Sequence, residues 1–346
     1  MISKTDNEPL TVNLRNLDLN ILNPFLKSQG IKLSGYVTGN ASTIAVLKAP
    51  KVSSDMIVHE LGLNNNILGD AEISSRWYSE TNEVNFSMNV MQDDVTRISV
   101  SGSAQPTKKE DNIFADVEMN ETSLVIFQPF LTGLVSDLSG QTSMNLLVRG
   151  SIAKPKINGT LSFNNAGVRV DYLNTRYSIN DKLGVENSRI TFENFTLKDV
   201  KNHTATATGY MDLSDLNSVK LNLRLNANRF QALNTTLKDN ELYCGTAYAT
   251  GNFLFQGPLN DMLIDINATT NEGTQFFLPI SDESSVGSDE LVTFVSRDTL
   301  ANSKKKEDSE LKLRLNFDLT VNPSAEVSIL LGENSGGTMT EKGKGS

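Results

Sequence analysis

The chain contains very little cysteine and histidine. Its 346 residues include one cysteine, Cys244, and two histidines, His59 and His203. One cysteine excludes an intramolecular disulfide framework and any zinc site made only of cysteines. The two histidines lack the spacing of a metal site, and we interpret both as surface or turn residues. The sequence therefore predicts no metal site, no cofactor and no catalytic residue.

Basic residues and long hydrophobic runs are also scarce. The chain has 31 Lys and Arg against 41 Asp and Glu, a formal net charge of −10, which argues against a nucleic-acid partner and a polybasic membrane patch. No segment approaches the roughly 18 consecutive apolar residues of a bilayer-spanning helix. Residues 1–10 lack the apolar core of a signal peptide. Two interpretations stay open: a cytosolic protein, or an internal piece of a longer one.

The sequence does contain many segments in which apolar and polar residues alternate. Successive side chains of a strand point to opposite faces of a sheet, so this alternation predicts strands with one apolar face. Clusters of Asn, Asp, Gly and Ser separate the segments at hairpin spacing, which predicts an all-β, antiparallel sheet. The apolar residues of the three clearest segments are the candidate lining of one face: Val84, Phe86, Met88, Val90, Val219, Leu221, Leu223, Leu225, Leu311, Leu313, Leu315, Phe317 and Leu319.

Helical periodicity is scarce, and the best example is a single segment. Apolar residues follow helical spacing from Phe130 to Leu138, and Pro129 suits a first helical turn. We therefore expect one short helix over this segment of an otherwise all-β chain.

An internal repeat organises the sequence. At an offset of 105 residues, Pro24-Phe25-Leu26 matches Pro129-Phe130-Leu131, and Leu33-Ser34-Gly35 matches Leu138-Ser139-Gly140. A repeat of this length holds several strands and predicts one continuous sheet extended by duplication. We expect about three units, residues 10–115, 116–220 and 221–331, with a flexible insertion at 281–310 and a truncated tail at 332–346.

An apolar face of this length cannot stay in contact with water. Burial of apolar surface gains roughly 25 cal/mol per Å², so the face has to pack on a second sheet, curl on itself or be covered by a ligand. The sequence lacks the Cys…Trp…Cys spacing of an immunoglobulin sandwich. The alternation alone favours an ordinary packed core, with a curled sheet and an apolar groove as the alternative.

Several segments resemble TamB-type translocation and assembly module proteins. They are residues 161–177 (LSFNNAGVRVDYLNTRY), 192–199 (FENFTLKD) and 239–258, together with the joints Gly150…Pro155 and Gly257-Pro258. The resemblance is closest to the Bacteroidetes branch of this family, which belongs to the AsmA-like superfamily. It covers about residues 10–331.

The resemblance implies a fold and a function. The fold is a long curled antiparallel sheet with an apolar β-groove and one or two short helices. In that fold, the candidate lining residues would shield the acyl chains of phospholipids on their way to the outer membrane. The resemblance also implies support of outer-membrane protein assembly and secretion, without enzymatic activity.

The resemblance further implies a periplasmic location and two membrane contacts. Its members are anchored in the inner membrane by an N-terminal helix and work with an outer-membrane barrel of the BamA family. The sequence shows neither that anchor nor the last C-terminal strands of the family. We therefore interpret it as an internal piece, and expect the contacts with the inner membrane and the barrel to lie outside it.

Other functions stay open. The same fold could offer strand edges to outer-membrane proteins as a scaffold or chaperone, by β-augmentation and without lipid transport. A repeat adhesin is a further alternative. We disfavour a carbohydrate-active β-helix enzyme, because its carboxylate constellation cannot be located and the repeat is too long for a β-helix rung.

Overall fold

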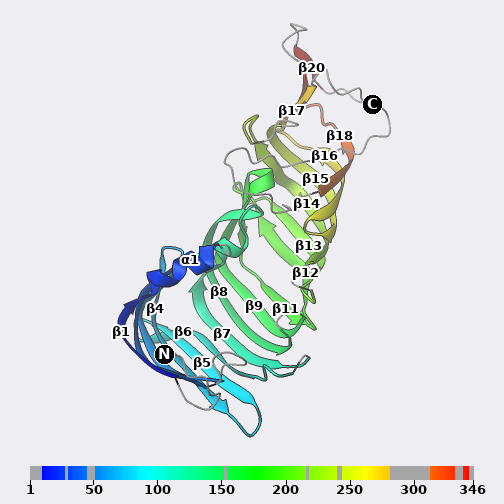
Figure 1. Cartoon of the computed structure of the whole chain (residues 1–346). Coiled ribbons are helices and arrows are strands. Elements are labelled where there is room, and N and C mark those ends of the chain that lie inside the picture. The colour runs from blue at the N-terminus through cyan, green and yellow to red at the C-terminus, as the bar shows by residue number, and fades with distance from the viewer. Residues whose placement is uncertain are drawn as a thin grey trace. The chain divides into compact units, whose positions relative to one another are not determined.

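The computed structural model describes residues 10–27, 30–44, 51–108, 110–151, 154–215, 218–239, 244–280, 312–331 and 338–342. In this part of the chain most residues lie in strands, and all strands belong to one sheet (Figure 1). The chain forms two compact units: the first comprises residues 1–132, 137–166 and 184–188, and the second comprises residues 133–136, 167–183 and 189–346. The predicted all-β fold is confirmed.

The elements follow one another with little helix between them. In chain order the strands are β1 (Leu10–Asp18), β2 (Leu33–Ile44), β3 (Lys51–Leu63), β4 (Asn66–Tyr78), β5 (Glu83–Gln92), β6 (Val95–Ala104), β7 (Ile113–Ser123), β8 (Val135–Gly150), β9 (Pro155–Val170), β10 (Thr175–Ile179), β11 (Lys182–Glu186), β12 (Arg189–Lys198), β13 (Thr204–Asp212), β14 (Lys220–Thr235), β15 (Cys244–Pro258), β16 (Asp261–Thr270), β17 (Gln275–Ile280), β18 (Lys312–Thr320), β19 (Glu326–Leu331) and β20 (Thr338–Lys342). The short helical segments include η1 (Leu19–Leu22), α1 (Asn23–Leu26), η3 (Leu124–Phe130) and η4 (Asp171–Leu173), of which only α1 is an α-helix.

Most neighbouring strands in the sequence are antiparallel neighbours in the sheet. Strands β1 through β8 pair successively in this way, and so do β12 through β16. Strands β16 and β18 are parallel, as are β17 and β19, so the sheet is mixed rather than purely antiparallel. A parallel pair needs a connection of about a dozen residues or more, and residues 281–311 separate β17 from β18. The predicted insertion at 281–310 lies outside the described residues.

In the first unit one face of the sheet is apolar and the other is polar. The register places Val90 of β5 between Ala71 of β4 and Ile98 of β6, and the alternation continues across the unit. On the opposite face the hydroxyls of Ser74 and Ser87 are 2.8 Å apart and hydrogen-bonded. Residues that pack together on the apolar face of the first unit are Leu14, Val37, Met56, Val58, Ala71, Ile73, Met88, Val90, Ile98, Val100 and Met119.

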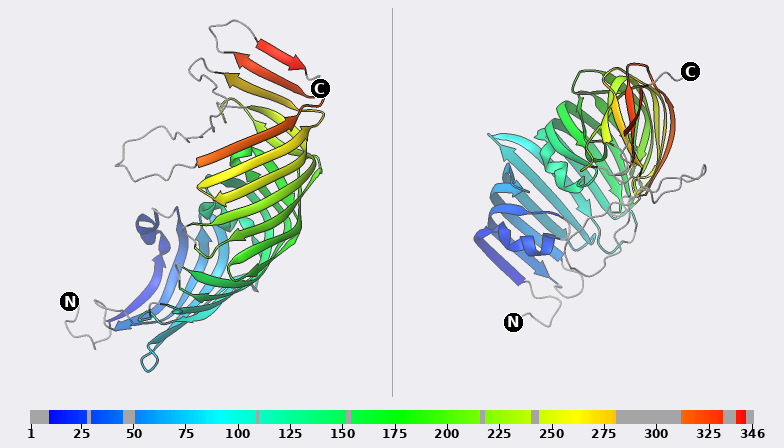
Figure 2. Two further views of the ribbon diagram at one scale, coloured as in Figure 1. Left: turned by 90° about the vertical axis from the view of Figure 1, so that its right-hand side faces the viewer. Right: turned by 90° about the horizontal axis from the view of Figure 1, so that it is seen from above.

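Bulges interrupt several strands. In each bulge described here, a side-chain oxygen of the neighbouring strand accepts the backbone N–H of the bulged residue. In β1 the register shifts around Asn16, which has φ +50° and donates its backbone N–H to Thr38 Oγ1 of β2 (3.0 Å). In β7 the N–H of Glu121 donates to Ser143 Oγ of β8 (2.9 Å). In β3 the N–H of Glu60 donates to Asp70 Oδ1 of β4 (2.9 Å), and in β14 the N–H of Arg229 donates to Thr250 Oγ1 of β15 (3.0 Å). Bulges bend a strand and increase its twist, which fits the curl of the sheet within each unit (Figure 2).

Elements of the first two predicted repeat units correspond at the offset of 105 residues. The bulged residues Asn16 and Glu121 are 105 positions apart, and so are their acceptors Thr38 and Ser143. The helical turns after β1 and β7 also correspond, since Asp18 and Ser123 each accept a backbone N–H two residues further on. In the third predicted unit, Phe230-Gln231 repeats the sequence Phe127-Gln128 of η3 but lies in β14 and not in a helical turn. The division into three units stays a prediction.

The predicted helix from residue 129 to residue 138 is wrong in its extent. The helical segment there, η3, covers Leu124–Phe130, and β8 already begins at Val135. Gly133 between them has φ +84°, a left-handed conformation that commonly ends helices. Within the predicted tail at 332–346, strand β20 pairs with β19.

Helical turns cover one end of the apolar face in the first unit. Leu19 of η1 and Ile126 of η3 are buried in its hydrophobic cluster, and α1 lies at the same end of the strands (Figure 1). At this closed end Val58 and Val90 are 3% and 1% exposed. At the other end of the strands, the open end, Val52 is 39% exposed. Leu10 and Val12 of β1 are exposed there to a similar extent.

We expect truncation of Val58 to destabilise the first unit more than truncation of Val52, although both valines lie in β3 and face the same side. Val58→Ala removes buried methyl groups and leaves a cavity, which costs about 1–3 kcal/mol. Val52→Ala removes exposed groups and costs less than about 0.5 kcal/mol. Urea unfolding followed by the fluorescence of Trp77, the one tryptophan, measures both changes. Equal costs would contradict a closed and an open end.

Candidate functional site

The first group of predicted lining residues lies together in β5. Val84, Phe86, Met88 and Val90 alternate along this strand and all face the apolar side of the first unit. Met88 and Val90 belong to its hydrophobic cluster. Val84 and Phe86 lie nearer the open end and are partly exposed. The row thus runs from a sealed end to an end that water reaches.

The second group lies along β14 in the second unit. Leu221, Leu223 and Leu225 alternate in the strand, and Val219 directly precedes it. The register places Leu225 beside Phe253 of β15. All four predicted residues are partly exposed, so this face is also incompletely covered.

The third group lies in β18, also in the second unit. Leu315 pairs in register with Ile264, and Leu319, which is 42% exposed, pairs with Ala268. Leu311 and the side chains of Leu313 and Phe317 lie outside the described part of the structure. The predicted lining therefore divides between the two units, and the second and third groups share the apolar side of one set of strands.

Small residues that the sequence reasoning left out form a deeply buried part of the apolar face in the second unit. Ala205, Ala207 and Ala227 are each 1% exposed. Ala205 and Ala227 share a hydrophobic cluster with Tyr177 and Phe230, whose stacked rings have centroids 4.7 Å apart. A signal was present, since Ala205 and Ala207 alternate with threonines in residues 204–209 (TATATG). Large apolar residues dominated the periodicity, and this weaker alternation was not used.

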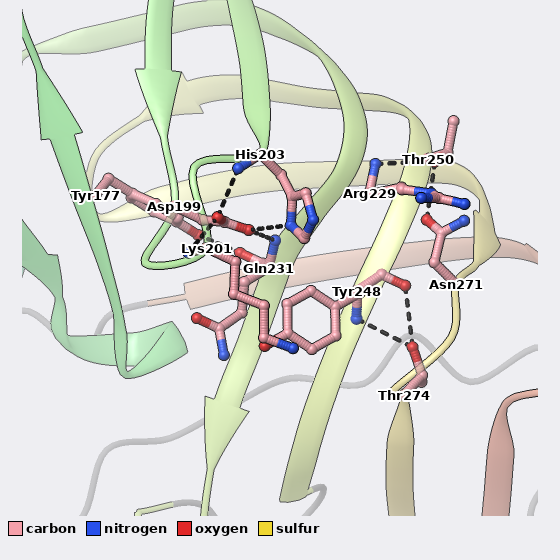
Figure 3. Close-up of polar contacts among 10 residues, drawn as sticks. All are labelled: Tyr177, Asp199, Lys201, His203, Arg229, Gln231, Tyr248, Thr250, Asn271 and Thr274. Atoms are coloured by element: carbon pink, nitrogen blue, oxygen red, sulfur yellow. Dashed lines mark hydrogen bonds and ion pairs between the residues drawn. The ribbon is translucent and has the colours of Figure 1, made fainter.

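A polar cluster around Asp199 joins β14 to the turn between β12 and β13 (Figure 3). The buried Asp199 carboxylate accepts the backbone N–H groups of Lys201 (2.8 Å), His203 (2.9 Å) and Gln231 (3.0 Å). His203 Nδ1 lies 3.0 Å from it and carries the proton, because an ionised carboxylate only accepts. Burial by itself raises the pKa of Asp199, but these hydrogen bonds outweigh it and hold the pKa below its ordinary value.

Aromatic rings surround this polar cluster. Tyr177 Oη donates to the carbonyl oxygen of Gln231 (2.9 Å), and burial raises the pKa of the phenol. Lys201 Nζ lies 4.1 Å from the centre of the Tyr248 ring, and the His203 ring packs edge-on against it. These contacts satisfy backbone groups at a turn and a bulge. The cluster is therefore a structural joint between β14 and the turn that follows β12.

The single cysteine lies buried in β15. Burial raises the pKa of the Cys244 thiol, which disfavours the reactive thiolate. Within the described ranges, no group of three or more His, Cys, Asp or Glu side chains is placed to hold a metal ion. The helices of that same part of the chain are all too short or too polar to cross a membrane.

Comparison with known protein families assigns most of the chain. The family model described as "TamB, N-terminal domain" matches residues 2–163, and the one described as "TamB C-terminal domain" matches residues 193–345. The chain belongs to the TamB family. Its membership agrees with the curled all-β sheet and implies a role in membrane assembly. Neither the curated proteins nor the solved structures gave a match.

The family matches and the quoted sequence resemblance overlap only in part. Residues 239–258 and nearly all of 192–199 lie within the TamB C-terminal match. Most of 161–177 lies between the two matches. The resemblance to the TamB family is confirmed, although residues 164–177 of that segment lie outside both matches.

The Asp199 joint generates a prediction about pH. We expect Asp199→Asn to destabilise the second unit by about 2–3 kcal/mol at pH 7, because the amide cannot replace a carboxylate that accepts several hydrogen bonds. A folded-state pKa below the unfolded value of about 3.9 stabilises the fold above that pH, and the gain is lost as the pH falls through the folded pKa. The difference between the two proteins should therefore shrink below about pH 4.

Urea unfolding followed by circular dichroism, at pH 7 and below about pH 4, measures this difference in the free energy of unfolding. Glu193→Gln, at an exposed position of β12, is the matched control for loss of one negative charge. A variant of Asp199 as stable as the original chain at pH 7 would contradict the structural joint.

Proposed function

We propose that this TamB chain binds the acyl chains of phospholipids along the apolar faces of its sheet and shields them from water during transport to the outer membrane. One observation carries the proposal. Within each unit, the apolar residues of β5 in the first and of β14 in the second share one face of their strand, yet many of them stay partly exposed. All described strands belong to a single sheet, so no second sheet in the described residues covers that face. An apolar face that stays partly exposed is typical of a binding site.

The energy of lipid burial supports this proposal. Each acyl methylene that leaves water gains roughly 0.8 kcal/mol, so a chain of about 16 carbons gains on the order of 10 kcal/mol in a dry groove. Successive strands offer nearly equal apolar rows. A lipid could therefore pass from strand to strand without returning to water.

The proposal includes a location and partners taken from the TamB family. The chain works in the periplasm without catalysis, as part of a bridge between the inner and outer membranes. Its outer-membrane partner is a barrel of the BamA family, and the same bridge supports outer-membrane protein assembly and secretion. The family membership and the all-β sheet support these statements.

Photo-crosslinking separates lipid binding from the alternatives. We expect a photoreactive residue at Phe86 or Leu223 to label phospholipid in cell envelopes, because both face the apolar side. The same residue at Asn85 or Asn222, the next positions on the opposite face, should label little lipid. Mass spectrometry of the adducts identifies the label.

Three other results would change the conclusion. Equal lipid labelling from both faces would overturn the groove. Labelling of strand-forming outer-membrane proteins in place of lipid would favour a scaffold or chaperone. Labelling of glycans or surface proteins would favour an adhesin.

A further inference from the structure

Two helical turns at the closed end of the first unit expose large apolar side chains. Phe25 of α1 is 78% exposed, and Phe130 at the end of η3 is 60% exposed. Ile21 and Leu22 of η1 are also exposed. Both turns pack on the same hydrophobic cluster, and Figures 1 and 2 show them on one edge of the first unit. A group of apolar side chains at this edge is therefore in contact with water.

The two exposed phenylalanines occupy equivalent positions of the internal repeat. Both stand in the sequence Pro-Phe-Leu, 105 residues apart. Six residues before them in the sequence, Leu19 and Leu124 are buried. Each turn thus has one apolar side chain that packs on the sheet and one aromatic side chain that stays exposed. Single exposed apolar residues are normal on a protein surface, but a phenylalanine exposed in both copies of a turn indicates a common role.

The same turns carry no charged side chain. None occurs in residues 19–26 or in residues 122–136, although 21% of the chain is charged. Exposed Lys27 and Lys32 follow the first turn, and exposed Asp137 follows the second. Transfer of a charged group out of water is very costly, and these turns contain no such group. Their exposed surface can therefore enter an apolar phase.

We propose that the two turns dock the first unit on the surface of a phospholipid bilayer. Phe25 and Phe130 insert their rings between the headgroups and the first part of the acyl chains, together with Ile21 and Leu22. The neutral polar side chains of the turns stay at the level of the headgroups. This inference goes beyond the proposed function, because the contact requires no lipid in the groove. It is also separate from the membrane contacts that we expect outside the chain.

The size of the exposed apolar surface favours a bilayer over a second copy of the chain. A fully buried aromatic side chain covers about 150–250 Å², so the two rings and the two aliphatic side chains offer on the order of 400 Å². A stable dimer buries about 800 Å² on each partner. A bilayer needs no matching surface, because its fluid acyl chains adapt to side chains that project from a turn.

The charge of the chain favours apolar insertion over electrostatic attraction. The net charge of −10 repels an anionic membrane surface at long range. Beside the first turn, Lys27 and Lys32 oppose this repulsion only locally. We therefore expect docking on a zwitterionic bilayer that is driven by apolar burial and depends little on salt.

Vesicle flotation tests the docking. We expect the chain to float with vesicles of phosphatidylcholine, and about 0.5 M NaCl should change the bound fraction less than about twofold. Phe25→Ser and Phe130→Ser should each weaken the partition about tenfold, because each removes one inserted ring. Phe114→Ser, at an exposed position of β7 at the open end, is the matched control and should leave the partition unchanged.

Fluorescence quenching measures the depth of insertion. Phe25→Trp combined with Trp77→Phe places the one tryptophan of the chain in the first turn. We expect bromine near the headgroups to quench it more strongly than bromine at the end of the acyl chains, because interfacial side chains reach only about 5–10 Å into the bilayer. Tyr78→Trp in the same Trp77→Phe background, at an exposed position of the open end, is the control and should not be quenched.

The outcomes separate this docking from the proposed function. Unchanged flotation of Phe25→Ser and Phe130→Ser, or no quenching in the first turn, would overturn the docking and leave the groove untouched. A photoreactive residue at Phe25 that labels a protein and no lipid would show a protein partner in place of the bilayer. A dimer that Phe25→Ser dissociates would show a second copy there. Flotation that depends on Phe25, without lipid labelling from Phe86 or Leu223, would support the docking and overturn the proposed function.

Discussion

The structure depends on one constraint: a single sheet has two faces, and only one of them can be satisfied by water. Strands of this TamB chain turn polar side chains to one side and apolar side chains to the other. A sandwich would resolve the imbalance by packing a second sheet on the apolar side. Here local elements cover only part of it. In the first unit these are η1 and η3, and in the second unit an aromatic pair, Tyr177 and Phe230, joins the cluster of small residues. The remaining apolar surface is available to a ligand.

Curling a sheet around that surface has its own cost in backbone hydrogen bonds. A bulge removes an N–H from the ladder, and a backbone donor without an acceptor is expensive. In β1, β3, β7 and β14 a side-chain oxygen of the next strand accepts this N–H. The polar face therefore does more than contact water. Its threonine, serine and aspartate side chains stabilise the bent strands that shape the apolar face.

The sequence predicted what depends on local periodicity and missed what depends on long-range contacts. Alternation along β5 and β14 identified strands and the residues that share a face, because the strand period is a property of the backbone itself. The same reasoning extended a helix through Gly133, where a left-handed residue follows the helical turn and strand β8 begins two residues later. Asp199 could be recognised as a turn residue. Its hydrogen bond to Gln231, 32 positions away, depends on how β14 lies beside β13.

The candidate site residues also divide into those that local periodicity predicts and those that depend on long-range contacts. The lining residues are periodic and could be found one by one from the sequence. Ala205 and Ala227 are different, because they meet in one buried cluster only where β13 lies beside β14 in the folded register. No spacing in the sequence relates residues 177, 205 and 227 of this cluster, since they lie on three different strands. A site built across a sheet is therefore harder to predict than the sheet.

Transport also limits how strongly any single position can hold a lipid. Acyl burial is nearly uniform along the strands, so it favours entry into the groove without favouring one place in it. A strong headgroup site would trap the lipid and stop its movement. At the water-exposed end of the face, charge contacts contribute only about 0–1 kcal/mol, because water and salt screen them. Contacts of that size orient a headgroup and still release it. Weak polar contacts at the exposed end thus allow a bound lipid to keep moving.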